Sequence, residues 1–177
     1  MRLLFLSCVS VVFLVGCAGR FAGLPADTPV HTLTLRWQRL VDASDKTCPR
    51  CASTEQEVQK AFAHLKTSLA PAGIQVALET ERLDEAAFFK APLESNRIWI
   101  DGRALEDWLS AQTASSSCTG CCAGAECRTV CVGGATYEAI PAALIVRAGF
   151  LAAGEALRGG SPPPSSGLST TISAEEP

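Results

Sequence analysis

Cys48 and Cys51 are two residues whose type and spacing could do chemistry, because they stand in the run Thr47-Cys48-Pro49-Arg50-Cys51 between a predicted strand and a predicted helix. A thiolate at a helix N-terminus meets unpaired backbone N–H groups and the positive end of the helix dipole. Two intervening residues let the second thiol reach back to a mixed disulfide. We therefore predict thiol–disulfide exchange, with Cys48 attacking, Cys51 resolving and Arg50 adding a nearby cation.

Two alternatives apply to this pair. It could be a stable structural disulfide, or it could be one half of a metal site. The second half would have to come from cysteines elsewhere in the chain.

A second group of cysteines lies in residues 118–131, on a stretch rich in small residues. The candidate metal ligands in this group are Cys118, Cys121, Cys122 and Cys127, and Cys131 follows them. Three or four thiolates suit zinc or copper in its monovalent state, and by extension a trivalent metalloid. In an exported protein the alternatives are disulfides that staple a long loop, or a redox relay with Cys48 and Cys51.

The beginning of the chain predicts export. Residues 3–15 are almost all apolar, which is too short for a membrane-spanning helix of about 20 residues. The run Leu14-Val15-Gly16-Cys17 that follows resembles the lipobox of bacterial lipoproteins. The resemblance implies a signal peptide over residues 1–16, lipidation of Cys17 and a lipid bilayer as partner. Alternatives are a secretory signal cut between Ala18 and Gly19, or a retained anchor.

Ala18 adds a sorting expectation, since by analogy with Gram-negative lipoproteins a residue other than aspartate after the cysteine favours the outer membrane. The chain would then face the periplasm.

Seven of the nine cysteines remain once Cys8 and Cys17 are set aside, so complete internal pairing is impossible. The net charge of -3 and the sparse aromatic residues exclude a nucleic-acid partner.

Periodicity predicts one α/β domain over residues 31–157, after a tether at 17–30 and before a disordered tail at 158–177. Alternating residues predict strands at 32–41, 74–78, 96–100, 128–132 and 135–140. Helical spacing predicts helices from about 51 to 70, at 83–90 and at 141–157. Thr54 and Glu57 predict a capping box, and Asp101-Gly102 predicts a hairpin leading into residues 103–106.

The stretch at about 110–127 has no periodic pattern and is predicted to be an inserted cysteine-rich loop. The remaining polar residues have ordinary interpretations. His64 is expected to be solvated, and Asp84, Glu85, Glu106 and Asp107 to be helix caps and solvated faces. Trp99 and Trp108 are expected to be packing residues.

The order of strand, Cys-Pro-Arg-Cys, helix, strand and hairpin resembles the thioredoxin and glutaredoxin fold. Thioredoxins place a cis-proline directly before their third strand, where Ser95 or Asn96 stands here, while Pro92 comes too early. More closely, the chain resembles an uncharacterised thioredoxin-like family, the domain-of-unknown-function family numbered 2703. The blocks that carry this resemblance are residues 37–41, 47–51, 92–98, 105–109, 127–130 and 137–141.

This resemblance implies a thioredoxin-like mixed sheet with flanking helices and no settled activity. We expect a lipid-anchored domain that exchanges disulfides with a protein partner and is reset by an electron donor. Two further hypotheses stay open: capture of a soft metal or metalloid by the cysteines of 118–131, and a disulfide-stapled docking module without catalysis.

Overall fold

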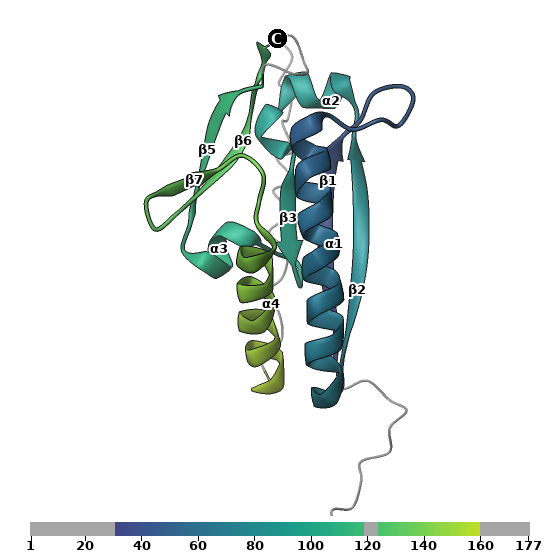
Figure 1. Cartoon of the computed structure of the whole chain (residues 1–177), viewed down its shortest axis with the longest axis vertical. Helices are drawn as coiled ribbons and strands as arrows, with labels where there is room; N and C mark the ends of the chain where they lie inside the picture. Colours follow the sequence, from purple (N-terminus) through teal and green to yellow (C-terminus); the bar gives the residue numbers. More distant parts are fainter. Residues whose placement is uncertain (1–30, 119–123, 160–177) are drawn as a thin grey trace, which may run out of the picture.

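The computed structural model describes residues 31–118 and 124–159, which form a mixed α/β domain (Figure 1). Its main sheet has four strands in the order β2-β1-β3-β4. They are β1 (His31–Leu40), β2 (Ile74–Leu83), β3 (Arg97–Ile100) and β4 (Arg103–Ala104). β1 is parallel to β2 and antiparallel to β3, and β3 is antiparallel to β4. The expected strand, helix, strand and hairpin order is therefore present in one sheet.

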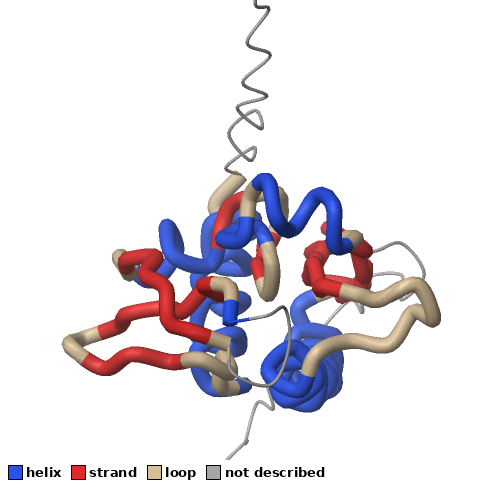
Figure 2. The backbone as a smooth tube through the Cα atoms, turned by 90° about the horizontal axis from the view of Figure 1, so that it is seen from above, coloured by secondary structure: helices blue, strands red, loops and turns tan. Residues whose placement is uncertain are grey.

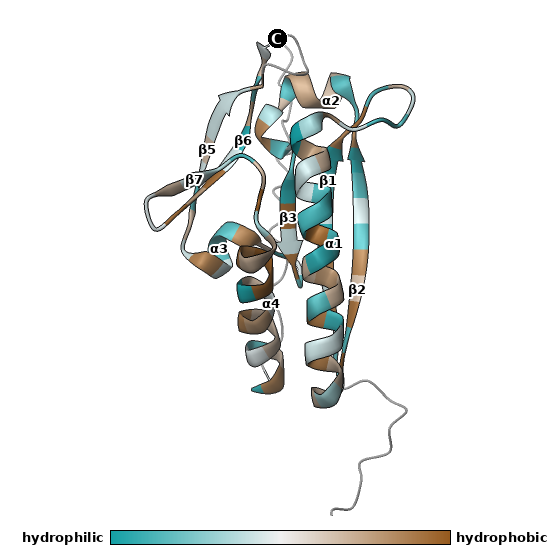
Figure 3. Cartoon of the chain, in the orientation of Figure 1, coloured by the Kyte–Doolittle hydropathy of each residue, from teal (hydrophilic) through white to brown (hydrophobic). Residues whose placement is uncertain are grey.

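Two long helices, α1 (Pro49–Leu69) and α4 (Ala142–Leu157), pack side by side on one face of this sheet (Figures 1 and 2). Leu65 of α1 packs against Gly149 of α4, where an added Cβ atom would lie 2.6 Å from a Leu65 methyl carbon. The absence of a side chain at Gly149 lets the two helices approach closely. Figure 3 shows the apolar colour along α4, which buries Ile145, Ala148 and Ala152.

The core explains why β1 forms where the sequence predicts it. Leu33, Leu35 and Trp37 alternate along this strand, and all three are buried against the helices. On the helix side, Val58, Ala61, Leu65 and Leu69 repeat at helical spacing and are buried as well. Burial of these two faces against each other is the main favourable contribution to folding.

Short elements connect the main ones. The turn after α1 is a 3₁₀ helix, η1 (Ala70–Ala72), and Gly73 then takes a left-handed conformation, so the chain reverses where Pro71 and Gly73 predict. α2 (Glu85–Lys90) is capped by the Asp84 carboxylate, which accepts a hydrogen bond from the Ala87 amide at 2.7 Å. η2 (Pro92–Glu94) leads to β3.

A second, antiparallel sheet lies between the end of β4 and the start of α4 in the sequence, and Figure 1 shows it to the left of the main sheet. Its strands are β5 (Gln112–Ser117), β6 (Glu126–Val132) and β7 (Ala135–Tyr137), in that order. We call this sheet the insert. The helix α3 (Leu105–Leu109) joins β4 to it.

A buried ion pair fixes the insert to the rest of the domain. The Arg128 guanidinium of β6 donates to Glu106 Oε1 of α3 at 2.6 and 3.0 Å. It also donates to the Leu93 carbonyl and to the Thr113 hydroxyl, both at 2.8 Å. Arg128 and Glu106 are only 5% and 6% exposed. One side chain therefore ties β6 to α3, η2 and β5.

Several sequence predictions are wrong in detail. The stretch from residue 110 is not all loop, because β5 pairs with β6. Its inward positions are the small Ala114 and Ser116, which give no apolar alternation. Residues 103–106 form only the two-residue strand β4 before α3 begins. Glu106 is not a solvated residue but the buried partner of Arg128.

The capping box at Thr54 and Glu57 is also wrong, because α1 begins earlier, at Pro49. Thr54 is fully buried inside the helix. The Glu57 carboxylate instead accepts the Ala142 amide at 2.9 Å, at the start of α4. Hydrogen bonds from Lys60 and from this amide lower the pKa of the Glu57 carboxyl.

The predicted signal peptide, the tether, Cys17 and most of the predicted tail lie outside the described residues. Within residues 31–118 and 124–159, no helix is long and apolar enough to cross a bilayer.

Replacing Arg128 tests the ion pair. We expect Arg128→Met to lower the free energy of unfolding by about 3–5 kcal/mol, because the Glu106 carboxylate would stay buried without a partner. Urea denaturation measures this change. As a control, Lys60→Met removes the exposed pair with Glu57 and should cost no more than about 1 kcal/mol. Adding Glu106→Leu to Arg128→Met should recover much of the loss, and equal losses in Arg128→Met and Lys60→Met would contradict the assignment.

Candidate thiol site

Cys48 is the N-cap residue of α1, so it stands directly before a 21-residue helix. Its backbone is extended, with φ -68° and ψ 157°, and its sulfur accepts a hydrogen bond from the Cys51 amide at 3.4 Å. Pro49 occupies the first helical position, where a missing N–H group does no harm. The sequence prediction that Cys48 lies at a helix N-terminus is therefore confirmed, and this place favours a thiolate.

Cys51 lies on the first turn of α1 and is almost completely buried. A hydrogen bond from its thiol to the Cys48 sulfur raises the pKa of Cys51 far above the ordinary value, and burial and the charge of Cys48 act in the same direction. Hydrogen bonds with the Leu40 backbone and the Thr47 side chain oppose this effect without cancelling it. A single negative charge on the pair therefore resides on Cys48.

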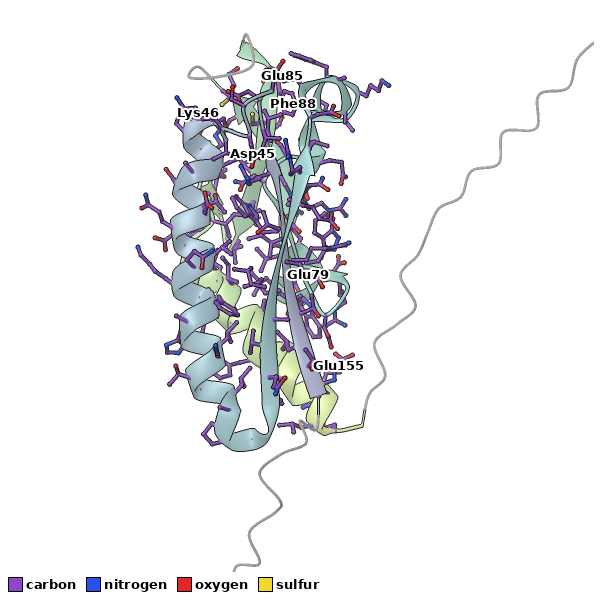
Figure 4. All side chains as sticks on the ribbon, turned by 90° about the vertical axis from the view of Figure 1, so that its right-hand side faces the viewer. Asp45, Lys46, Glu79, Glu85, Phe88 and Glu155 are labelled. Carbon is purple, nitrogen blue, oxygen red and sulfur yellow. The ribbon has the colours of Figure 1, made fainter. Side chains whose placement is uncertain are left out.

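The turn between β1 and α1 is held by its own polar groups. The Thr47 hydroxyl donates to the Leu40 carbonyl at 2.8 Å, and Val41 pairs with Thr47. The Asp42 carboxylate accepts the Ser44 and Lys46 amides at 2.8 and 2.9 Å. Figure 4 labels Asp45 and Lys46 in this turn, beside the start of α1. These bonds position Cys48 at the end of the strand.

Arg50 connects this turn to the insert. Its guanidinium donates to the carbonyls of Ser116 and Ser117 on β5 at 3.3 and 3.1 Å. It also forms an ion pair with Glu138 at 3.2 Å, and Glu138 in turn accepts the Ser116 hydroxyl at 2.8 Å. The cation that the sequence places near the thiols is thus engaged by the insert. We call these contacts the Arg50 clasp.

The clasp brings Cys118 and Cys127 to the same region as Cys48 and Cys51. Cys118 directly follows Ser117, and the Cys118 amide donates to the Ala125 carbonyl at 3.0 Å, so the β5–β6 register continues past Ser117. Cys127 lies opposite Ser116, which places it diagonally from Cys118 on one face of the hairpin. Cys48, Cys51, Cys118 and Cys127, with exposed fractions of 8%, 2%, 4% and 2%, belong to one hydrophobic cluster.

Cys131 lies apart from these four. It is four residues beyond Cys127 on β6, which corresponds to roughly 13 Å along a strand. Its side chain is half-buried and shares a hydrogen bond of 3.1 Å with the Thr136 hydroxyl. Substitution of Cys131 is therefore a suitable control for substitutions of Cys48 and Cys51.

The predicted metal site in the hairpin stays a prediction, because two of its ligands, Cys121 and Cys122, lie outside the described residues. Among residues 31–118 and 124–159, no three cysteine, histidine, aspartate or glutamate side chains are grouped so as to hold a metal ion.

Sequence reasoning missed the polar centre next to the thiols, which is built around Asn96. Its Oδ1 accepts Trp37 Nε1 at 3.2 Å, and its Nδ2 donates to Thr54 Oγ1 at 2.9 Å and to the Glu138 carbonyl at 3.2 Å. Thr54 Oγ1 also accepts the Ile140 amide at 3.2 Å. Asn96 has a φ of 56°, which asparagine tolerates better than most residues. The signal available in the sequence was an asparagine at the start of the strand predicted over residues 96–100.

The comparisons with known proteins give a family without an assigned activity. The family described as "Domain of unknown function (DUF2703)" matches residues 33–149. A protein of Archaeoglobus fulgidus described as uncharacterized is 38% identical over 113 residues, which cover 64% of this chain and 82% of that relative. No solved structure matches.

The pKa of Cys51 makes a prediction about stability. Because the folded state holds the Cys51 proton more tightly than the unfolded state, this contribution is complete below the ordinary thiol pKa of about 8.5 and is lost as the pH rises. We expect the free energy of unfolding of the reduced, metal-free chain to fall above that pH, with a slope of up to about 1.4 kcal/mol per pH unit from this group.

Urea denaturation between about pH 8 and pH 10 measures this slope. Cys51→Ser should reduce the slope, since serine does not titrate in this range, whereas Cys131→Ser should keep it. An unchanged slope in Cys51→Ser would contradict the raised pKa.

Proposed function

The chain belongs to the family described as "Domain of unknown function (DUF2703)", as the sequence blocks indicate, and we propose that it is a thioredoxin-like protein that exchanges disulfides through Cys48 and Cys51. The observation that carries this proposal is the position of Cys48. Its sulfur caps a long helix directly after a central strand, with the second thiol in hydrogen-bonding contact.

The topology supports the thioredoxin-like assignment. A Cys-Pro-Arg-Cys turn joins β1 to α1, a parallel strand follows, and an antiparallel hairpin completes a mixed sheet. Asn96 stands where thioredoxins place their cis-proline. Its amide bonds to Thr54, Trp37 and Glu138, so this position stabilises the domain next to the thiols.

The exchange would run in two steps. The Cys48 thiolate attacks one sulfur of a partner disulfide, forms a bond to it and expels the other sulfur as a thiolate, which takes up a proton. Cys51 then gives up its proton and attacks Cys48, which releases the second partner thiol and leaves a Cys48–Cys51 disulfide. Two electrons pass to the partner, and a donor dithiol outside the chain returns two electrons to the pair.

The raised pKa of Cys51 suits its resolving role. Its largest cause is the hydrogen bond to the Cys48 sulfur, and the charge of Cys48 adds to it. Both causes depend on a negative Cys48, so both weaken once Cys48 is joined to the partner. Cys51 is thus held protonated before the first step, and its proton is held less tightly at the second, where burial alone still raises the pKa of Cys51.

Substitution of single cysteines tests the exchange. We expect Cys48→Ser to abolish reduction of a low-molecular-weight disulfide by the dithiothreitol-reduced chain, because the attacking sulfur is lost. Cys51→Ser should instead accumulate a mixed disulfide between Cys48 and the substrate, visible by mass spectrometry. Cys131→Ser is the matched control and should keep the rate.

An unchanged rate of disulfide reduction in Cys48→Ser would contradict the exchange function. If every disulfide in the untreated protein also resisted mild reduction, this result would support the alternative of a disulfide-stapled docking module without catalysis.

We further propose that Cys17 is lipidated and anchors the domain at the periplasmic face of the envelope, and that Ala18 after this cysteine directs it to the outer membrane. Two observations support this proposal: the run Leu14-Val15-Gly16-Cys17 and the position of His31 in the fold. His31 pairs with Ile74, which follows the end of α1, so β1 begins at the opposite end of α1 from Cys48. The length of α1, about 30 Å, separates the two ends.

Figure 4 shows the same two ends: Lys46, in the turn before Cys48, lies at one end of the molecule, and Glu155 of α4 lies at the other. An anchor at Cys17 that reaches the domain through residues 17–30 would hold the His31 end towards the bilayer. The thiols would then face away from the membrane, towards partners in the periplasm.

Lipidation is tested in a Gram-negative host. We expect the chain to incorporate labelled palmitate and to sediment with membranes, and Cys17→Ala to lose both properties because the acceptor sulfur is gone. Cys8→Ala is the control and should behave as wild type, since that residue is removed with the predicted signal. Labelling that persists in Cys17→Ala, or is lost in Cys8→Ala, would rule out the anchor.

A further inference from the structure

The two sulfurs at the start of α1 are arranged as a pair of ligands as well as a redox pair. Cys48 caps α1 and Cys51 lies on its first turn, with the Cys51 amide donating to the Cys48 sulfur at 3.4 Å, so both sulfurs lie at the same end of the helix. A cation that prefers soft sulfur ligands, such as Cu(I), can bind between two such sulfurs once they are deprotonated. Two thiolates suffice for such an ion, whereas zinc in a structural site takes four ligands.

The charge balance favours a monovalent soft cation. A complex of Cu(I) with two thiolates carries one negative charge. The Cys51 amide already points at the Cys48 sulfur at 3.4 Å, and the N-terminus of the long helix α1 adds its positive dipole end. The helix therefore stabilises the same net charge on the complex that it stabilises on the singly ionised pair.

The residues around Cys48 and Cys51 disfavour hard cations and weaken the electrostatic repulsion between Arg50 and a bound cation. The two cysteines are buried in the hydrophobic core and offer soft sulfur ligands, whereas a hard cation prefers oxygen ligands and would have to lose its water there. Arg50, the cation that directly precedes Cys51 in the chain, is engaged by Glu138 and by the Ser116 and Ser117 carbonyls. These contacts offset part of its charge, so it repels a bound cation less.

The insert lies beside the start of α1. The clasp holds Ser117 next to Arg50, and Cys118, which follows Ser117, is buried. A small ion can reach sulfur atoms that are 8% exposed or less more readily than a folded protein can. Buried sulfurs also keep bound Cu(I) from water and oxygen.

From these observations we propose that Cys48 and Cys51 form a binding site for a soft monovalent cation of the Cu(I) type. The site is distinct from the cysteine cluster predicted within residues 118–131, and it goes beyond disulfide exchange. Binding joins one Cu(I) to the two sulfurs and releases the protons that the two sulfurs carry. No electron is transferred, because the cation enters and stays in its monovalent state.

Competition with a coloured chelator tests the site. The full chain is purified in detergent, reduced and kept anaerobic, and then titrated against the Cu(I) complex of bicinchoninate. We expect the wild type to remove one equivalent of Cu(I). Cys48→Ser and Cys51→Ser should each lower the affinity by at least about 100-fold, more than is typical for residues that only support a ligand. Cys131→Ser is the matched control and should bind as wild type does.

Two further measurements keep the outcome clear. Thermal unfolding reports whether each variant is folded. X-ray absorption at the copper edge of the wild type reports the ligands, and sulfur neighbours alone are expected. Nitrogen or oxygen ligands would overturn the assignment, as would full binding by the Cys48→Ser/Cys51→Ser double variant. Binding that survives in that double variant and is lost in Cys118→Ser would place the site in the hairpin instead.

The exchange assay and the Cu(I) titration are separate readouts on the same variants. A chain that reduces disulfides without binding Cu(I) would overturn this inference alone. A chain that binds Cu(I) at Cys48 and Cys51 without reducing disulfides would overturn the exchange function alone.

Discussion

The buried ion pair of Arg128 with Glu106 is the interaction on which the rest of the arrangement depends. Removing two charges from water is expensive, and it is tolerated here because the guanidinium also satisfies the Leu93 carbonyl and the Thr113 hydroxyl. Those partners come from α3, η2 and β5. Since all must be in place together, the pair sets one position for the insert against the main sheet, and with it the position of Cys118 and Cys127.

The Arg50 clasp adds a second attachment at Ser116 and Ser117, next along β5 from Ser115, the register partner of Arg128, and on the side of the thiols. The two attachments differ in kind. Arg128 is buried and bound on several sides, whereas Glu138 of the clasp is largely exposed to solvent and its ion pair with Arg50 is correspondingly weak. Local opening is therefore easier at the clasp than at Arg128. A partner disulfide that needs access to Cys48 would meet the site where the insert is held least firmly.

The proposed exchange and the proposed cation site follow from the same physical feature, a pair of cysteines at a helix N-terminus. Disulfide formation removes two electrons together with the protons that the two sulfurs carry, whereas cation binding removes protons only. Both reactions use the helix dipole to stabilise negative charge on sulfur. The surrounding apolar residues then restrict which reactants arrive, since hydrated hard ions are disfavoured there.

The sequence by itself determined the long elements and the position of the thiols. Alternation along β1, helical spacing along α1 and the Cys-Pro-Arg-Cys run between them predict the local structure, because each depends on residues close in the chain. Only the tertiary structure decided that β5 pairs with β6, that Glu106 is buried, and that Asn96 joins three segments. These depend on partners such as Arg128 and Thr54 that are 22 and 42 positions away, and a pattern of neighbouring residues carries no information about such distant contacts.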